Sequence, residues 1–452
     1  MSAGDTHDTR PVPAGGFAPE AAFLECVHCG LCHGACPTYV ELGTEADSPR
    51  GRIHLMRALQ DGTLALDADV VRHLDLCLGC RGCETACPSG VRYGSLIEAA
   101  RPWIEARHRR GVVARARRRL ALALLPDRRR MHLVLAPLRV LEQLGVLALL
   151  RRGARGLPPR WRYQLHLLPD PLTRAAEIPS ETAPTSGERA RVQLLVGCVM
   201  PELFGDTVRS TLTVLARAGC RVLAPAAQGC CGALALHAGD RAAAQRCARA
   251  NVDAFEPANA PSGAAALSPG TATALVVNAA GCGAMMKEYG ALLADDPAYA
   301  ARAARLAARV RDATELLCEL TAAPPPVASD ATAFRRVAYH DPCHLAHAQG
   351  IRAAPRALLA AIPGIILVPM ADEDLCCGSA GHYNVMQPEM ARRLVARKVE
   401  AIRASGADVV ATANAGCALQ LEAGLRAAGL STRVRHVLDL LAEALPAAGG
   451  RR

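Results

Sequence analysis

The chain has 452 residues, of which 51% are hydrophobic and 21% charged, so it can form about three domains with apolar cores of their own. Its nineteen cysteines are odd in number, and eight stand at spacings typical of iron–sulfur proteins, which argues against a disulfide-stabilised scaffold and for a reducing compartment. The formal net charge is +10, and residues 101–162 alone carry +14, since they hold seventeen arginines and three acidic residues; the rest of the chain carries −4.

The chain begins with a polar stretch, residues 1–17, that is rich in glycine and proline. No apolar stretch follows basic residues there, so we see no secretory signal and expect a flexible N-terminus.

Two runs of four cysteines share one spacing. The first cysteine run is Cys26-x2-Cys29-x2-Cys32-x3-Cys36-Pro37, and the second cysteine run is Cys77-x2-Cys80-x2-Cys83-x3-Cys87-Pro88. In two-cluster ferredoxins, three thiolates of a run hold one 4Fe–4S cluster and the cysteine before proline holds the other cluster. We therefore expect two clusters with crossed ligands: Cys26, Cys29, Cys32 and Cys87 on cluster 1, and Cys77, Cys80, Cys83 and Cys36 on cluster 2.

Zinc and disulfides are the alternatives for these cysteines. Structural zinc sites usually combine two separated pairs of cysteines, and neither run has that form. Disulfides between adjacent Cys-x-x-Cys steps would close short, strained loops. The spacing therefore favours iron–sulfur clusters.

Residues 18–100 are predicted to form a helical domain around the two runs. Residues 50–60 carry Ile53, Met56 and Leu59 at helical spacing, and Asp67 can cap a second helix. No alternating strand pattern is visible between the runs. The region resembles the α-helical type of two-cluster ferredoxin domain.

Residues 101–190 are predicted to be a basic helical linker. Residues 120–125 and 133–150 are apolar and helical in pattern, but Pro126, Pro137, Arg139 and Glu142 interrupt them. A spanning helix needs about 20 uninterrupted apolar residues, so we expect no membrane crossing here. Residues 169–187 are expected to form a loop or tether.

Three interpretations of the arginines in residues 101–162, the basic segment, remain open. The helices can pack an apolar face on the protein and expose their arginines to water. They can instead bind anionic lipid or an acidic partner subunit. Nucleic acid is disfavoured, because aromatic residues for base stacking are few and no recognition motif is present.

The remaining chain contains an internal repeat of alternating strands and helices. Module 1 (residues 191–323) has strands near residues 191–196, 222–223 and 274–278, and module 2 (residues 335–445) has strands near 336–339, 365–368 and 408–412. A proline run at residues 324–326 separates them. Alternating strands and helices predict a parallel sheet in each module, in a multidomain protein that starts with the α-helical ferredoxin-type domain.

Each module places four cysteines just after the ends of its strands. They are Cys198, Cys230, Cys231 and Cys282 in module 1, and Cys343, Cys376, Cys377 and Cys417 in module 2. Ligands bind at this edge of open α/β sheets, and four thiolates suffice for a further iron–sulfur cluster in each module. The alternatives are a transient dithiol site or cysteines that only pack in the core.

The sequence contains further candidate residues near these cysteines, for which we expect structural or minor functional roles. His340, His344 and His347 flank Cys343 and could donate a ligand or relay a proton, although histidines at strand ends are more often only hydrogen-bonded. Cys220, Cys247 and Cys318 fall outside the repeat and are expected to be structural. Gly281-x-Gly283 is too short a match to a dinucleotide fingerprint, so we expect no FAD or nicotinamide on this chain.

The paired Cys-Cys-Gly modules behind a two-cluster ferredoxin domain resemble the cysteine-rich-domain iron–sulfur proteins. Within that group, the segments at residues 340–347, 374–381, 383–389 and 412–417 most resemble the iron–sulfur subunits of glycolate oxidase. The resemblance extends to heterodisulfide reductase and to anaerobic glycerol-3-phosphate dehydrogenase. In heterodisulfide reductase a fifth thiolate ends each module, but Met285 and Gln420 stand there in this chain, which speaks against heterodisulfide chemistry.

The resemblance implies an electron-transfer subunit with no catalytic residue of its own. Its FAD-binding partner subunit would oxidise glycolate to glyoxylate, and this chain would pass the electrons through its clusters to a quinone or other acceptor. The complex would be cytoplasmic and peripheral on the inner membrane. Lactate or glycerol-3-phosphate as the donor, or a thiol–disulfide reductase at the Cys-Cys-Gly sites, are the alternatives.

Overall fold

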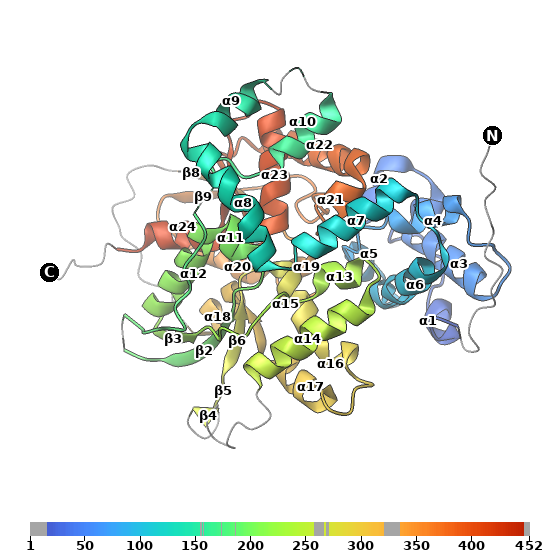
Figure 1. Ribbon diagram of the computed structural model, residues 1–452, viewed down its shortest axis with the longest axis horizontal. Helices are drawn as coiled ribbons and strands as arrows, with labels where there is room; N and C mark the ends of the chain where they lie inside the picture. Colours follow the sequence, from blue (N-terminus) through green and yellow to red (C-terminus); the bar gives the residue numbers. More distant parts are fainter. Residues whose placement is uncertain are drawn as a thin grey trace.

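The computed structural model describes residues 16–153, 156, 158–172, 174–185, 187–256, 266–267, 271–320 and 335–446. Most of the expected flexible N-terminus, the proline run at residues 324–326 and the greater part of the loop before the third strand of module 1 lie outside these residues. In Figure 1 the ferredoxin-type region, drawn in blue, occupies one end of the molecule, and the two modules fill the other.

The N-terminal region is helical, as its sequence predicts. Ser48 Oγ accepts a hydrogen bond from Gly51 N at 3.0 Å and starts one helix, while Asp67 Oδ1 accepts from Val70 N at 2.8 Å and starts the next. The helices are α1 (Glu20–Leu24), α2 (Pro37–Leu42), the 3-10 helix η1 (Glu45–Asp47), α3 (Pro49–Gln60), α4 (Ala68–Asp75), α5 (Gly82–Thr85) and α6 (Tyr93–Arg107).

Four more helices follow in the basic region: α7 (Val112–Leu124), α8 (Arg128–Gln143), α9 (Val146–Gly153) and α10 (Pro159–His166). Helix α6 crosses the domain boundary expected at residue 100. Helix α8 packs on the start of module 1, and α10 packs on module 2 (Figure 1). Within the described ranges, no helix is long and apolar enough to cross a bilayer.

Module 1 is built on a five-stranded sheet in the order β1-β3-β2-β6-β7. Its one antiparallel strand, β1, comes from the stretch 169–187 that was expected to be a loop or tether, because residues 181–182 pair with β3. Its elements are β1 (Glu181–Thr182), β2 (Ala190–Leu195), α11 (Met200–Leu203), α12 (Gly205–Arg217), β3 (Cys220–Leu223), α13 (Ala233–His237), α14 (Arg241–Phe255), the small hairpin β4 (Ala266–Leu267) and β5 (Thr271–Ala272), β6 (Ala274–Val277), α15 (Ala280–Lys287), α16 (Tyr289–Leu292), α17 (Ala300–Arg309), β7 (Val310–Asp312) and α18 (Ala313–Leu320).

Module 2 contains a four-stranded parallel sheet in the order β11-β10-β8-β9. Its elements are β8 (Arg335–Tyr339), α19 (Cys343–Ala346), α20 (Ala353–Ala360), β9 (Ile365–Val368), α21 (Tyr383–Met386), α22 (Pro388–Ser405), β10 (Val409–Thr412), α23 (Ala415–Ala427), β11 (Arg433–His436) and α24 (Val437–Ala444). The order β9-β8-β10-β11 matches β3-β2-β6-β7 of module 1, so the two modules are copies of one fold, as the repeat predicts.

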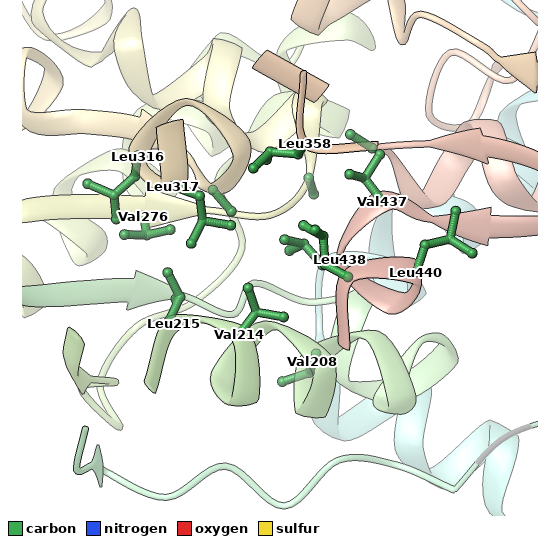
Figure 2. Packing of buried hydrophobic residues seen from close by; sticks show 14 of the residues in the cluster. Val208, Val214, Leu215, Val276, Leu316, Leu317, Leu358, Val437, Leu438 and Leu440 are labelled. Atoms are coloured by element: carbon green, nitrogen blue, oxygen red, sulfur yellow. The ribbon is translucent and has the colours of Figure 1, made fainter. Parts of the chain in front are cut away.

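One hydrophobic core joins the two modules. Helix α12 of module 1 packs against α24 of module 2, and buried leucine and valine side chains from both modules meet between them (Figure 2). The core includes Val214 and Leu215 on one side and Val437 and Leu438 on the other, all almost fully buried. Burial on this scale makes the pair of modules a single packed unit.

Candidate iron–sulfur and metal centres

The two cysteine runs lie side by side in the helical domain, but their exposures differ. The second run starts from the buried Cys77, whereas Cys29 in the first run is exposed. Apolar side chains around the first run are also exposed: Leu24, Val27 and Leu31 are 56%, 65% and 63% accessible. The first run therefore faces solvent around Cys29, whereas its last cysteine, Cys36, is buried like Cys77 and Cys83 of the second run.

The proposed ligands of cluster 2 surround one cavity. Cys36 of the first run lines it together with Cys77, Cys80 and Cys83 of the second run. Negative charge on Cys80 or Cys83 would interact with charge on both Cys36 and Cys77, so these two thiols lie near the other two. This donor set, three thiols of one run plus the last thiol of the other, fits a 4Fe–4S cluster with crossed ligands.

Positive and polar groups surround this cavity. Arg52 is 1% exposed, and its guanidinium lies 3.8 Å from Cys36 Sγ and 3.5 Å from Asp47. Burial raises the pKa of the Cys77 thiol, but the Arg52 and Arg101 guanidiniums outweigh it and lower that pKa overall. Tyr93 OH and Gly79 N donate to Cys77 Sγ at 3.5 and 3.4 Å. These contacts stabilise negative charge at the sulfurs.

The proposed ligands of cluster 1 are less enclosed. Cys26, Cys32 and Cys87 are partly buried against the helical core, and Cys29 is exposed. Burial raises the pKa of the Cys32 thiol, and the neighbouring Cys26 and Cys36 thiols add to it, while backbone hydrogen bonds oppose it. Cys32 thus lies near sulfurs of its own run.

In module 1, the four predicted cysteines meet at the carboxyl edge of the sheet. Cys198 Sγ lies 3.6 Å from Cys230 Sγ, and Cys231 Sγ lies 3.3 Å from Cys282 Sγ. Cys282 is the third residue of α15, in the first turn of that helix.

A fifth cysteine, Cys247, joins this group, although the sequence pattern placed it among the structural cysteines. Its thiol is hydrogen-bonded to the Cys230 thiol. It lies on α14 against Gly232, where an added Cβ would meet the Cys247 Cβ at 3.2 Å. No spacing rule could find this residue, because helix packing brings it to the site.

Module 2 gathers its four predicted cysteines in the same way. Cys343 Sγ and Cys376 Sγ are 3.9 Å apart, and Cys377 is hydrogen-bonded to Cys376 and to Cys417. Cys417 is the third residue of α23, as Cys282 is of α15. The counterpart of Cys247 is Leu394, because Gly378 packs against Ala391 and Leu394 as Gly232 packs against Ala244 and Cys247.

Two further groups lie at the thiols of module 2. A ring nitrogen of His340 and the sulfurs of Cys377 and Cys417 all lie within 4.8 Å of one another. Lys398 is 1% exposed, and its ammonium interacts electrostatically with Cys377, Cys376 and Cys417. Burial lowers the pKa of His340 well below its ordinary value, and the nearby Lys398 adds to the effect.

The other histidines of this motif have different environments. His344 Nδ1 lies 3.6 Å from Cys343 Sγ, and its ring lies 5.3 Å from that of His237 in module 1. His347 bonds to Thr85 Oγ1 at 2.9 Å and to the Asp374 carbonyl at 3.1 Å, so it joins the ferredoxin-type domain to module 2.

The remaining sequence candidates lie away from the thiols or have other roles. Gln420 is buried and accepts hydrogen bonds from Tyr163 OH at 2.6 Å and Asn384 Nδ2 at 3.1 Å, and Met285 is in the core. Cys220 is buried in β3, and Cys318 Sγ lies 3.7 Å from the Ala354 carbonyl. These contacts are structural.

The second cysteine run contacts both modules. Cys80 packs in one apolar cluster with Cys343 and Cys376 of module 2, and Tyr383 OH donates to the Leu76 carbonyl at 3.0 Å. Arg81 forms an ion pair with Glu288 of module 1. The sulfur groups of the domain and of module 2 are therefore adjacent.

Known protein families match the ferredoxin-type domain and both modules. The family model described as a cysteine-rich domain matches residues 192–287 and 337–422, and the model for a 4Fe-4S dicluster domain matches residues 22–91. The "Probable glycolate oxidase iron-sulfur subunit" of Bacillus subtilis (strain 168) is 38% identical over 433 residues, which cover 94% of each chain.

Two other proteins are also similar to this chain. The "Glycolate oxidase iron-sulfur subunit" of Escherichia coli (strain K12) is 35% identical over 93% of each chain. The "Lactate utilization protein A" of Exiguobacterium sp. (strain ATCC BAA-1283 / AT1b) is 31% identical over 56% of this chain and 97% of its own length.

Proposed function

The chain belongs to the family of glycolate oxidase iron–sulfur subunits, and we propose that it carries electrons from an FAD-bearing partner subunit that oxidises glycolate to glyoxylate. It is the iron–sulfur subunit of an oxidoreductase complex, and the substrate is oxidised on the partner. The observation that supports this role most strongly is that Cys36 of the first run lines one cavity with Cys77, Cys80 and Cys83 of the second run, while Cys29 is exposed.

The eight cysteines of the two runs are proposed to hold two 4Fe–4S clusters, with Cys36 and Cys87 exchanged between them. When bound, such clusters supply one-electron chemistry at potentials that depend on charge, hydrogen bonds and exposure. Around Cys77, this chain provides Arg52, Arg101 and Tyr93, which favour added negative charge. We therefore propose that cluster 2 has the higher potential of the two.

The exposed first run is the proposed docking surface for the flavin subunit. Leu24, Val27 and Leu31 are exposed apolar side chains beside the exposed Cys29. A flavoprotein that covers them would bury apolar area and shorten the distance between its flavin and cluster 1. Electrons would then pass inward to the second run.

The acceptor side is proposed to lie on the basic segment. Helices α7 and α8, with the residue that caps α8, expose apolar side chains among their arginines: Val113, Leu120, Leu133 and Leu144 are 67% to 79% exposed. Basic helices with exposed leucines bind anionic lipid surfaces. A cavity lined by Arg117 and Arg118 of α7 and by His382 of module 2 also reaches Cys77. We propose that a quinone or another small acceptor with hydrogen-bond-accepting oxygens reaches cluster 2 there.

Lactate is the second candidate donor, because the lactate utilization proteins also match the chain. They cover only 56% of it, whereas the two glycolate oxidase subunits cover almost all of it. Glycolate is therefore the preferred donor.

The test is affinity purification through a tag on this chain, followed by flavin analysis and dye reduction with glycolate, lactate and glycerol-3-phosphate. We expect an FAD protein to copurify and glycolate alone to be oxidised. Val27→Asp together with Leu31→Asp should release the flavin subunit while iron and sulfide contents stay unchanged. Purification without any flavoprotein, or oxidation of lactate in place of glycolate, would overturn the proposal.

A further inference from the structure

A cavity of about 130 Å³ lies where the ferredoxin-type domain, helix α7 and the two modules meet. A cavity of about 150 Å³ can hold one benzene molecule, so this one has room for a small organic acid. The charged side chains that line it are four arginines and two carboxylates: Arg101, Arg110, Arg117, Arg118, Asp75 and Glu105.

We propose that this cavity binds one small carboxylate anion, of the size of glycolate, and that the bound anion lowers the potential of cluster 2. The binding does not depend on the proposed function, whereas the effect on cluster 2 rests on it. The anion would occupy the cavity proposed for the electron acceptor, so it would regulate the last transfer of electrons from this chain.

The first argument is the net charge of the lining. Four guanidinium charges stand against two carboxylate charges, an excess of two positive charges. Arg101 Nη2 donates to the Cys77 carbonyl at 2.7 Å, so its charge is shared with cluster 2. One positive charge then remains for the occupant of the cavity, and a monocarboxylate neutralises it.

The second argument is how the charged groups of the lining are paired. Arg110 Nη2 donates to Asp75 Oδ1 at 3.0 Å, and Arg110 Nε donates to Glu105 Oε1 at 2.9 Å. Glu105 also forms an ion pair with Arg118 at 3.2 Å. The two carboxylates therefore neutralise Arg110 and Arg118.

Arg117 is the arginine that these carboxylates leave unpaired. Its guanidinium donates to the Met386 carbonyl at 2.9 Å, and within the described ranges it forms no ion pair. Arg117 is exposed, while the side chain of Arg118 beside it is only 18% accessible. A guanidinium is a planar fork of donors that matches a carboxylate, so Arg117 is the primary contact that we infer for the anion.

The third argument is the imidazole of His382, which module 2 contributes to the lining. His382 is buried, and its Nδ1 has no hydrogen-bond partner among the residues that the structure describes. Burial lowers the pKa of His382 to about 4, and the charges of Arg118 and Arg101 add to the effect, so the ring is neutral at pH 7. With its proton on Nδ1, the neutral ring can donate to a carboxylate, which supplies the partner that this buried nitrogen lacks.

Cys77 connects the cavity to cluster 2. It lines this cavity and also the cavity that the four proposed ligands of cluster 2 surround. A carboxylate beside Cys77 disfavours the further negative charge that reduction adds to the cluster. By linkage, reduction weakens carboxylate binding to the same extent. Tenfold weaker binding to the reduced chain corresponds to a fall of about 59 mV in a one-electron potential.

The test uses the full chain with both clusters, expressed without its flavin subunit and kept anaerobic. Calorimetric titration with glycolate should find about one site per chain, and glycolamide, which has the same shape without the charge, should bind at least about tenfold more weakly. Arg117→Gln should weaken glycolate binding at least about tenfold as well, whereas the matched control Arg115→Gln, an exposed arginine of the same helix, should leave it unchanged. In EPR-monitored redox titrations, glycolate should lower the potential of cluster 2 in the unaltered chain and not in Arg117→Gln.

Absent glycolate binding, equal binding of glycolate and glycolamide, or full glycolate binding in Arg117→Gln would overturn the inference. Phosphate that binds as tightly as glycolate would overturn the assignment to a carboxylate. If Arg117→Gln fails to fold, the comparison of the three ligands on the unaltered chain decides. Glycolate that binds and leaves the potential of cluster 2 unchanged would overturn the coupling. Failure of the proposed function is observed separately, as missing iron or as a complex that does not oxidise glycolate.

Discussion

Arg52 and Cys36 are in contact in the centre of the ferredoxin-type domain, with a guanidinium nitrogen 3.8 Å from the Cys36 sulfur and both side chains buried. Cys36 belongs to the first run in sequence, but it lines the cavity of the second run. Arg52 comes from α3, between the runs, so this helix helps to fix the crossed ligand.

Replacing Arg52 by Met should damage both stability and potential. The change breaks the buried ion pair with Asp47, which then keeps only the His73 imidazole at 2.8 Å, and breaking a buried ion pair costs up to about 3–5 kcal/mol. It also removes positive charge from Cys36 and Cys77, so the potential of cluster 2 should fall. EPR-monitored redox titration and thermal unfolding measure the two effects. Arg57→Gln, on the exposed side of the same helix, should change neither, and an unchanged potential in Arg52→Met would contradict the assignment.

Serine substitutions can test the crossed ligands. Cys36→Ser should remove the enclosed cluster 2, and Cys87→Ser should remove the exposed cluster 1. Each variant should lose about four of about eight iron atoms. The iron left in Cys36→Ser should react with a chelator faster than the iron left in Cys87→Ser, because Cys29 is exposed. The opposite order of rates would mean that the ligands are not exchanged.

The sequence could predict the elements whose signals are local. Asp67 begins a helix as its capping pattern predicts, and the repeat predicted three parallel strands in each module. The fourth strands β7 and β11 were missed, because each has only three or four residues and alternates with charged side chains. Helix α11 ends just before Gly205, where α12 begins and where residues 174–176 pack too closely for any side chain.

The residues of the candidate site also fall into those that local sequence patterns predict and those that only the folded structure brings together. Cysteine spacing identified the two runs and the four thiols of each module, whereas Cys247, Arg52 and Lys398 are brought in by helix packing and leave no local pattern. His340 was only one of three candidate histidines in its motif. Its distance to Cys377 and Cys417 distinguishes it from His344 and His347, and that distance depends on how three strands pair.

The buried Asp312 should make stability depend on pH. Burial raises its pKa to about 6, and the nearby Glu315 adds to this, although Thr314 N and Oγ1 donate to its carboxylate and oppose it. A raised carboxyl pKa stabilises the fold below the unfolded value of about 3.9, and this stability is lost as pH rises through about 6. The loss amounts to about 2–3 kcal/mol.

Asp312→Asn keeps an oxygen for Thr314 and removes the charge. The variant should therefore be more stable than the unaltered chain at pH 8, by about 2–3 kcal/mol, and similar at pH 4. Urea unfolding at both pH values measures the difference, with the exposed Asp206→Asn as control. Equal pH dependence in the variant and the unaltered chain would show that Asp312 is not responsible.

The basic segment should bind anionic vesicles. Leu120→Ser, Leu133→Ser and Leu144→Ser together remove exposed apolar side chains, each worth about 1.5–3 kcal/mol when buried, so binding should weaken at least about tenfold. Ile366→Ser, an exposed apolar residue in β9, is the matched control. Sedimentation with vesicles containing anionic lipid measures this, and undiminished binding of the triple variant would exclude this surface.

EPR of the anaerobically purified complex, before and after addition of glycolate, tests electron transfer through this chain most directly. The account predicts signals of reduced 4Fe–4S clusters with glycolate and not with lactate or glycerol-3-phosphate. It also predicts that Val27→Asp with Leu31→Asp abolishes these signals, while dithionite still reduces both clusters. Clusters that dithionite reduces and glycolate does not, in a complex that retains its flavin subunit, would contradict it.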